Sequence, residues 1–283
     1  MGIFGSKPDT HQWNRNTRIS WDETGAAALL GEIKDMIRPF KERHHALNIL
    51  VFGPTGCGKS SLLNGLRTSC QRKTTVATYF PVGTSQDVSF TRDFQCSTWE
   101  DCVTLFDMAG VFESPKIKSE DILNIVQGKV PFTGEINDFL EPKTLESAEN
   151  RKHISCVVLV LKPGMELPVN LKRICSVVRS SAGKGEIACH LVITHLDEVD
   201  DCFKTPRNLN RVFDEMPKIQ NSVKQMSSEI GIPPYSISFV RNYSHESQSD
   251  VMSTVLFLHT FKQILNAACE QEEKRTERAA NAE

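Results

Sequence analysis

Residues 53–60 read Gly53-Pro54-Thr55-Gly56-Cys57-Gly58-Lys59-Ser60, which matches the phosphate-binding loop pattern GxxxxGK[ST] at every fixed position. The apolar run Leu47–Phe52 precedes the loop, and the residues from 61 onward have helical spacing. The strand, loop and helix that this motif requires are therefore all predicted. Glycines let successive backbone N–H groups turn inward around an anion, because they adopt conformations that are costly for other residues. We interpret this stretch as a nucleotide-binding loop.

The residue types in the loop indicate how it would hold a nucleotide. The Lys59 ammonium should reach the β- and γ-phosphates, helped by the positive end of the following helix, and it is a catalytic candidate for that reason. Ser60 offers its hydroxyl to Mg²⁺. Further nucleotide contacts are expected from Gly53, Thr55, Gly56, Cys57, Gly58 and Ser61. Cys57 could instead be a redox-sensitive thiol, although no feature of the sequence indicates a lowered pKa.

The composition favours a cytoplasmic protein that does not bind nucleic acid. The 283 residues include 33 Lys and Arg against 35 Asp and Glu, and this net charge of −2 gives no reason to expect a polyanionic partner. The nine cysteines follow no CxxC pattern, as in proteins whose thiols stay reduced. No apolar run approaches the ~18 residues of a membrane-spanning helix, and the N-terminus lacks the pattern of a secretory signal.

The pattern divides the chain into four predicted parts. They are a flexible N-terminal arm at residues 1–20, an amphipathic helix at 21–44, a P-loop GTP-binding domain at 45–269 and a charged tail at 270–283. The arm begins Met1-Gly2-Ile3-Phe4-Gly5-Ser6, which fits the N-myristoylation pattern, so Gly2 is a candidate for lipidation. A single myristoyl chain binds membranes weakly, and we therefore expect reversible peripheral membrane association.

The residues after the loop include a candidate mobile switch. Thr84 follows a stretch rich in Thr, Ser and Gly, and we expect its hydroxyl to close over Mg²⁺ and the γ-phosphate as a catalytic and metal-binding group. Thr74, Thr75 and Thr78 are competitors for this role. The alternating pattern of residues 88–94 predicts a strand directly after the switch.

A second phosphate motif, Asp107-Met108-Ala109-Gly110, has the form DxxG and follows the apolar run 102–106. At the end of such a strand, Asp107 can hold Mg²⁺ and Gly110 can offer its N–H to the γ-phosphate. The next residue is Val111, where Ras-like enzymes place the Gln that orients the attacking water. Hydrolysis should therefore be slow, or should depend on another residue or a second copy of the chain.

The base-reading loop is expected at Thr194-His195-Leu196-Asp197, in the place of the guanine motif [NT]KxD. The Asp197 carboxylate can accept from the N1–H and the exocyclic amine of guanine, whereas adenine offers an acceptor at N1 and no amine at C2. His195 replaces the usual Lys and could cover the base by stacking. Asn242 follows the last predicted strand, where G proteins place a loop beside the base.

These segments together resemble the interferon-induced protein 44 family. The resemblance rests on residues 48–61, 107–110, 121–128 and 194–197 and on Asn242-Tyr243-Ser244, and it spans about residues 45–268. It implies a GTP-binding domain related to the dynamin and translation-factor branch, with Lys59 and Ser60 at phosphate and Mg²⁺, Asp107 near Mg²⁺ and Asp197 at guanine. It also implies an interferon-linked, antiviral or antiproliferative setting. Some members carry an N-terminal TLDc domain that we do not find here, so roles that depend on it are not expected.

The order of the predicted elements indicates an α/β three-layer P-loop NTPase G domain, a mainly parallel sheet with helices on both faces. Later strands are predicted at residues 154–161, 187–193 and 235–240, separated by helical patterns. Three functions are consistent with these patterns. The first is a GTP/GDP switch with slow hydrolysis, with a homo-oligomer as one candidate assembly. The second is a GTP-bound scaffold with little turnover, and the third, which Asp197 opposes, is a P-loop ATPase or kinase.

Overall fold

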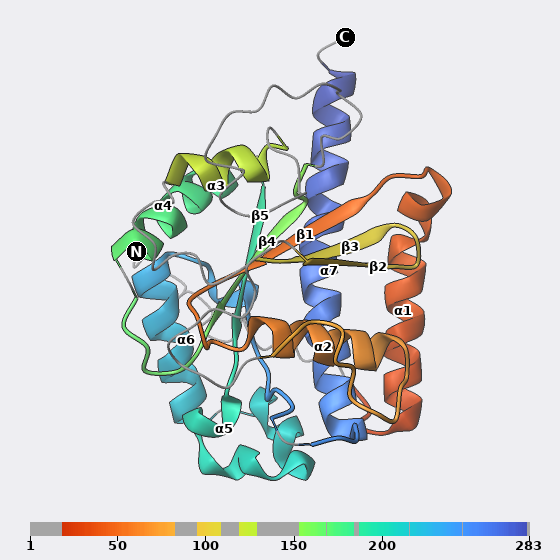
Figure 1. The fold of residues 1–283 in the computed structure, drawn as a ribbon, viewed down its shortest axis with the longest axis vertical. Coiled ribbons are helices and arrows are strands. Elements are labelled where there is room, and N and C mark those ends of the chain that lie inside the picture. The colour runs from red at the N-terminus through yellow and green to blue at the C-terminus, as the bar shows by residue number, and fades with distance from the viewer. Residues whose placement is uncertain are drawn as a thin grey trace, which may run out of the picture.

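The computed structural model describes residues 19–82, 95–108, 119–128, 153–167, 169–183, 187–214, 216–244 and 246–281. These residues form a six-stranded sheet with helices packed around it (Figure 1). The strands are β1 (Leu47–Phe52), β2 (Gln95–Trp99), β3 (Val103–Asp107), β4 (Cys156–Leu161), β5 (Ala188–Ile193) and β6 (Ile237–Phe239). Their spatial order is β2-β3-β1-β4-β5-β6. β2 runs antiparallel to β3, and the other neighbouring pairs are parallel.

The alternation of side chains along β1 explains why both faces of the sheet are covered. Ile49 and Val51 belong to an apolar core shared with α1 (Glu23–Glu42), α2 (Lys59–Cys70) and α7 (Val251–Ala280). Leu50 and Phe52 belong to a second core shared with α4 (Val169–Gly183) and α6 (Pro217–Ile230). Successive side chains of a strand point to opposite faces, so the two cores lie on opposite sides of the sheet. The predicted three-layer α/β fold is confirmed.

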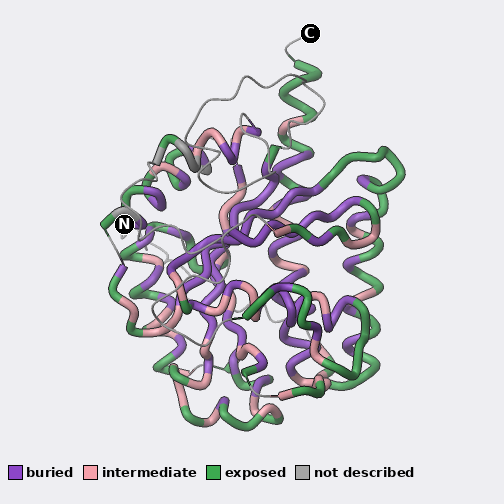
Figure 2. The backbone as a smooth tube through the Cα atoms, viewed as in Figure 1, coloured by how far each residue is buried: buried purple, intermediate pink, exposed green. Residues whose placement is uncertain are grey.

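Shorter elements complete the fold. They are the helices α3 (Ser119–Val126) and α5 (Leu196–Val199) and the 3-10 helices η4 (Asp201–Lys204), η5 (Pro206–Phe213) and η6 (Pro234–Ser236). Figure 2 shows the same layering through burial, with buried residues along the central strands and exposed residues on the outer turns of the helices and in the loops. The carboxyl ends of the parallel strands β1, β3, β5 and β6 lead into the segments that carry the predicted site residues.

The helix expected within residues 21–44 is α1, which lies beside α7 (Figure 1). Asp22 caps its first turn by accepting a hydrogen bond from the Gly25 N–H at 2.8 Å. Its buried face includes Leu29, Ile33 and Ile37, at the spacing that a helix requires. Among the residues that the structure describes, no helix combines the length and the apolar character needed to cross a membrane.

The C-terminal segment differs from the expected charged tail at 270–283, because α7 continues as one helix to Ala280. Gln271 and Glu272 are buried rather than exposed. Arg275 donates to Glu272 Oε1 at 2.7 Å, and His45 Nε2 lies 2.9 Å from Glu272 Oε2. Glu272 is thus paired with Arg275 of the same helix and with His45 before β1, although most of the other charged residues of this segment are exposed.

Candidate functional site

The phosphate-binding loop joins β1 to α2 and requires glycine at two positions. Gly53 has a φ of +154°, and a Cβ there would lie 2.2 Å from the Val160 carbonyl oxygen. Gly58 has a φ of +85°, and a Cβ there would lie 2.4 Å from Asn242 Nδ2. Both contacts are too short for a side chain, so the motif glycines permit a close approach of backbone to backbone and of backbone to Asn242. The loop therefore has the compact shape that an anion-binding turn needs.

Lys59 begins α2, and its side chain is buried across the loop. Its Nζ donates to the carbonyl oxygens of Gly53 at 3.0 Å and Pro54 at 2.8 Å. These two bonds hold the ammonium over the same backbone that would surround a phosphate. The first N–H groups of α2 have no partner within the helix, and the positive end of the helix dipole lies at this place. The ammonium therefore lies within the loop, and its contact with phosphates stays a prediction.

The predicted metal ligands meet directly. Ser60 Oγ donates to Asp107 Oδ2 at 2.7 Å, which joins the first turn of α2 to the end of β3. Burial raises the pKa of Asp107 to about 6, while the Ser60 hydrogen bond and the Lys59 charge act in the opposite direction. Asp107 Oδ1 is buried and has no hydrogen-bond partner among the described residues. A free buried carboxylate oxygen beside a hydroxyl is a donor set that fits Mg²⁺, which takes few protein ligands and completes its shell with water and phosphate oxygens.

The predicted base-reading loop is attached to the phosphate-binding loop through Thr194. This buried residue follows β5, and its hydroxyl donates to the Cys57 carbonyl oxygen at 2.7 Å. The same hydroxyl lies 3.1 Å from the Leu161 carbonyl oxygen and 2.9 Å from His195 Nδ1. His195 adopts a left-handed backbone conformation with a φ of 51° and occupies the position before the first residue of α5, without a capping hydrogen bond from its side chain. Thr194 and His195 therefore sit beside the loop, as a base-reading segment requires.

Asp197 lies in the first turn of α5 and is half-buried. Within the described residues its carboxylate receives no hydrogen bond, so both oxygens are free to accept from a ligand. Asn242, by contrast, is already engaged with the loop, because its Nδ2 donates to the Gly58 carbonyl oxygen at 3.0 Å. Its Oδ1 is buried and has no partner in the described part of the chain. The sequence predicted nucleotide contact for Asn242, and the structure adds this backbone contact.

Cys57 is buried beneath the loop, and burial raises the pKa of its thiol despite the nearby Lys59 charge. A thiol with a raised pKa forms little thiolate and reacts slowly. The structure therefore favours the inert interpretation over a redox-sensitive thiol.

Four predicted positions lie outside the described residues: Gly2, Thr84, Gly110 and Val111. The chain before Thr84 is held against α2 by Asn64, a residue that no sequence pattern singles out. The Asn64 amide donates to the Phe80 carbonyl oxygen at 2.8 Å and accepts from the Phe80 N–H at 2.9 Å. Thr74, Thr75 and Thr78 are exposed in the segment that leads to this anchor.

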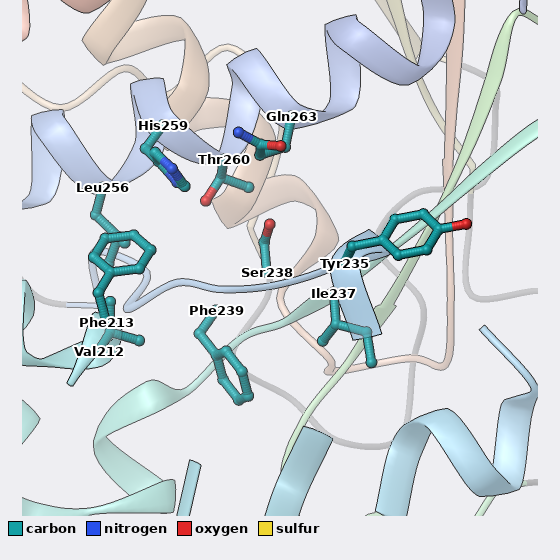
Figure 3. A pocket seen from close by; sticks show the side chains of 10 residues that line it. All are labelled: Val212, Phe213, Tyr235, Ile237, Ser238, Phe239, Leu256, His259, Thr260 and Gln263. Atoms are coloured by element: carbon teal, nitrogen blue, oxygen red, sulfur yellow. The ribbon is translucent and has the colours of Figure 1, made fainter. Parts of the chain in front are cut away.

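A second place with buried polar atoms is a hollow of about 20 Å³ between α7, β6 and η5 (Figure 3). His259, Thr260 and Gln263 of α7 face Ser238 across the hollow, and Phe213, Leu256 and Phe239 form its apolar side (Figure 3). His259 Nε2 and Thr260 Oγ1 are buried without hydrogen-bond partners among the described residues. Ser238 Oγ lies 2.8 Å from Nε2 of the buried His190. The hollow has room for about one water molecule, and the described residues that line it include no lysine, arginine or glycine.

Comparison with curated proteins agrees with the family resemblance. The chain is 27% identical over 260 residues to human interferon-induced protein 44-like, covering 85% of this chain and 55% of that protein. It is 25% identical over 261 residues to interferon-induced protein 44 of Mus musculus, covering 86% and 59%. The curated homologues of this chain are interferon-induced protein 44 proteins. The chain spans about half the length of these relatives, and no family model matches it.

Two solved structures are among those similar to this chain. One is the G domain of the T. maritima FeoB iron transporter, at 14% identity, with coverage of 79% of this chain and 99% of that chain and a TM-score of 0.39. The other is a probable GTP-binding protein, engB, at 14% identity, with the same coverage and a TM-score of 0.44.

Proposed function

We propose that this relative of the interferon-induced protein 44 proteins binds GTP and GDP with Mg²⁺ and acts as a switch with slow intrinsic hydrolysis. The observation that carries the proposal is the hydrogen bond between Ser60 Oγ and Asp107 Oδ2 at 2.7 Å, beside the buried Lys59 ammonium. This arrangement joins the two phosphate motifs of the sequence, although they are 47 residues apart. It leaves one buried carboxylate oxygen of Asp107 available.

Each residue has a distinct task in the proposed complex. Lys59 would exchange its bonds to the Gly53 and Pro54 carbonyls for phosphate oxygens. Ser60 and Asp107 would hold Mg²⁺, which neutralises phosphate charge when it is bound. Asp197 would read the guanine edge, while Thr194 keeps the base loop against the phosphate loop.

Slow turnover is the part of the proposal that depends on Val111. A valine side chain has no group that can orient water, so intrinsic rates should resemble the ~10⁻⁴ to 10⁻² per second of unassisted G proteins. Thr84 is the proposed hydroxyl over the γ-phosphate. A GTP-bound scaffold with little turnover is the alternative that Val111 also favours, and an ATPase or kinase is disfavoured by Asp197.

Guanine recognition is tested by comparing the affinities of GTP, GDP and ATP for the unmodified chain and for Asp197→Ala. We expect a preference for guanine nucleotides, and a selective loss of roughly 1 to 3 kcal/mol of their binding energy in the variant, because two base donors would lose their acceptor. The neighbouring exposed Glu198 supplies the matched control, and Glu198→Ala should leave the preference unchanged. Equal affinity for ATP and GTP in the unmodified chain would contradict the guanine assignment.

The switch and scaffold alternatives separate in a multiple-turnover assay of phosphate release from GTP at several protein concentrations. A slow rate that rises with concentration supports a switch that a second copy completes. Undetectable release with tight binding supports the scaffold. A fast rate that does not depend on concentration would contradict the role given to Val111.

The cellular setting is a proposal that rests on the relatives, whose names describe them as interferon-induced. We place the protein in an interferon-linked innate immune or antiviral response, in the cytoplasm, with peripheral membrane association through an N-myristoyl group on Gly2. Intact mass after co-expression with N-myristoyltransferase tests the lipid, and an unacylated Gly2 would contradict it.

A further inference from the structure

The loop that follows β6 is braced by an ion pair that the sequence did not predict. Arg241 pairs with Glu246, and the exposed fractions of their side chains are 12% and 32%. The second carboxylate oxygen of Glu246 accepts from the Ser244 N–H at 2.8 Å and lies 3.4 Å from the Ser244 hydroxyl. The Glu246 carboxylate therefore bonds both to Arg241 at the start of this turn and to Ser244 near its end.

The braced loop contacts the phosphate-binding loop through the Asn242 amide, which donates to the Gly58 carbonyl oxygen at 3.0 Å. That carbonyl also accepts from the Leu62 N–H at 2.9 Å, as the first bond of α2. The carbonyl and the N–H of a trans peptide point in opposite directions, so fixing the Gly58 carbonyl also fixes the direction of the Lys59 N–H. This N–H lies at the amino end of α2, where the first N–H groups of a helix have no partner within the helix and can face an anion.

The far side of the same loop is tied to the chain that leads to the predicted switch. The Val76 N–H donates to the Ser247 carbonyl oxygen at 3.0 Å, and the Ser249 N–H donates to the Thr74 carbonyl oxygen at 2.9 Å. The loop is thus held at both ends, and the Arg241–Glu246 pair and Asn242 lie between these attachments.

We propose that Arg241 and Glu246 are positioning residues for the nucleotide, which act through Asn242 on the Gly58–Lys59 peptide. The inference rests on the proposed function, since it concerns how tightly the same site holds GDP and GTP. Arg241 Nη1 is buried and has no hydrogen-bond partner among the described residues, so the guanidinium depends on Glu246 for its charge compensation. Loss of either partner should release the turn and let the Asn242 amide leave the Gly58 carbonyl.

The test is a set of affinities for fluorescently labelled GDP in the presence of Mg²⁺. Arg241→Ala and Glu246→Ala should each weaken binding by roughly tenfold, and by no more than Asn242→Ala does, because both residues act on the site only through Asn242. In an Asn242→Ala background, which itself weakens binding, neither change should weaken it further, because the two residues act through Asn242. Glu32→Ala, which removes the Glu32–Lys262 pair between α1 and α7, is the matched control and should leave the affinity unchanged.

Thermal unfolding without nucleotide shows that each variant is folded. Glu246→Gln keeps an acceptor for Arg241 and should therefore lose less GDP affinity than Glu246→Ala. Full affinity in Arg241→Ala and Glu246→Ala would overturn the inference and leave the proposed function standing. An equal further loss in the Asn242→Ala background would also overturn it, since the pair would then act on the fold in general. Absence of GDP binding by the unmodified chain would overturn the proposed function and this inference with it.

Discussion

The phosphate-binding loop and the hollow between α7, β6 and η5 both bury titratable side chains, and their difference shows what distinguishes a binding site from a core contact. At the phosphate loop, burial raises the pKa of Asp107 to about 6. Beneath α7, burial lowers the pKa of His259 to about 4 and that of His190 to about 3. The same cause disfavours the charged form in both places.

The surroundings of these groups differ in kind. Asp107 accepts a hydrogen bond from Ser60 in the first turn of α2. The amino end of that helix and its Lys59 lie beside the glycine-rich phosphate-binding loop. His259 packs its ring against Phe213 at a centroid distance of 4.7 Å, in a hollow that fits one water molecule. Burial of a polar group is therefore not enough to indicate a ligand. The phosphate loop is a candidate site because several donors and acceptors converge on one glycine-rich turn of the kind that binds anions.

The largest effect that separates the two regions is expected from Lys59→Ala. Nucleotide binding should be lost, because the loop loses the charge that reaches the phosphates. The hollow beneath α7 should be unaffected, so the near-ultraviolet circular dichroism should stay that of the unmodified protein. Binding is measured by titration with labelled GDP, and retained affinity would contradict the phosphate site.

A smaller effect is expected from Asp107→Asn, which keeps the shape of the side chain and an acceptor for Ser60. Mg²⁺-dependent affinity for GTP should fall, because a neutral amide is a poor ligand for Mg²⁺. The folded state without nucleotide should be at least as stable at pH 7, since an ionised buried carboxylate is removed.

The pH dependence gives a second readout of this variant. The folded-state pKa of Asp107, about 6, lies above its ordinary value of 3.8. The folded state therefore binds the extra proton, and the free energy of unfolding falls as pH rises through this window. Asp107→Asn should lack this contribution in urea unfolding between the two pKa values. An unchanged pH profile would show that the carboxylate is not buried as described.

The smallest effect, with the opposite sign, is expected from His259→Gln. The pKa of His259 is lowered from 6.5 to about 4, mainly by burial and further by the charge of Lys262 on its own helix. The unfolded state then binds more protons, so stability is lost as pH falls from about 6.5 towards 4. The variant should lose less stability in this range, with no change in GDP affinity at neutral pH. A variant as acid-sensitive as the unmodified chain would contradict this assignment.

Local patterns were sufficient to predict much of this structure. Short stretches of neighbouring residues predicted the loop at residues 53–60 and the acid at the end of β3. They also predicted the strands β1, β3, β4, β5 and β6. A short apolar run bounded by turn residues predicts a buried strand, and a pattern of glycines predicts a turn with positive φ angles. Two other expectations were not confirmed in this way. The predicted strand at 88–94 lies outside the described residues, and β2, which directly follows it, was not predicted. The expected tail at 270–283 is mostly helix.

Only the tertiary structure decided how the site is assembled. Thr194 donates to a carbonyl 137 residues away, and Asn242 donates to one 184 residues away. A backbone carbonyl is present at every residue, so no letter of the sequence can identify it as the partner of a particular side chain. The Arg241–Glu246 ion pair could not be predicted from the sequence either, because many oppositely charged residues lie a few positions apart and only the folded structure shows which of them pair. The sequence by itself determined the chemistry that the loop can perform, and the packing of β5, β6 and α2 determined which side chains hold the loop in place.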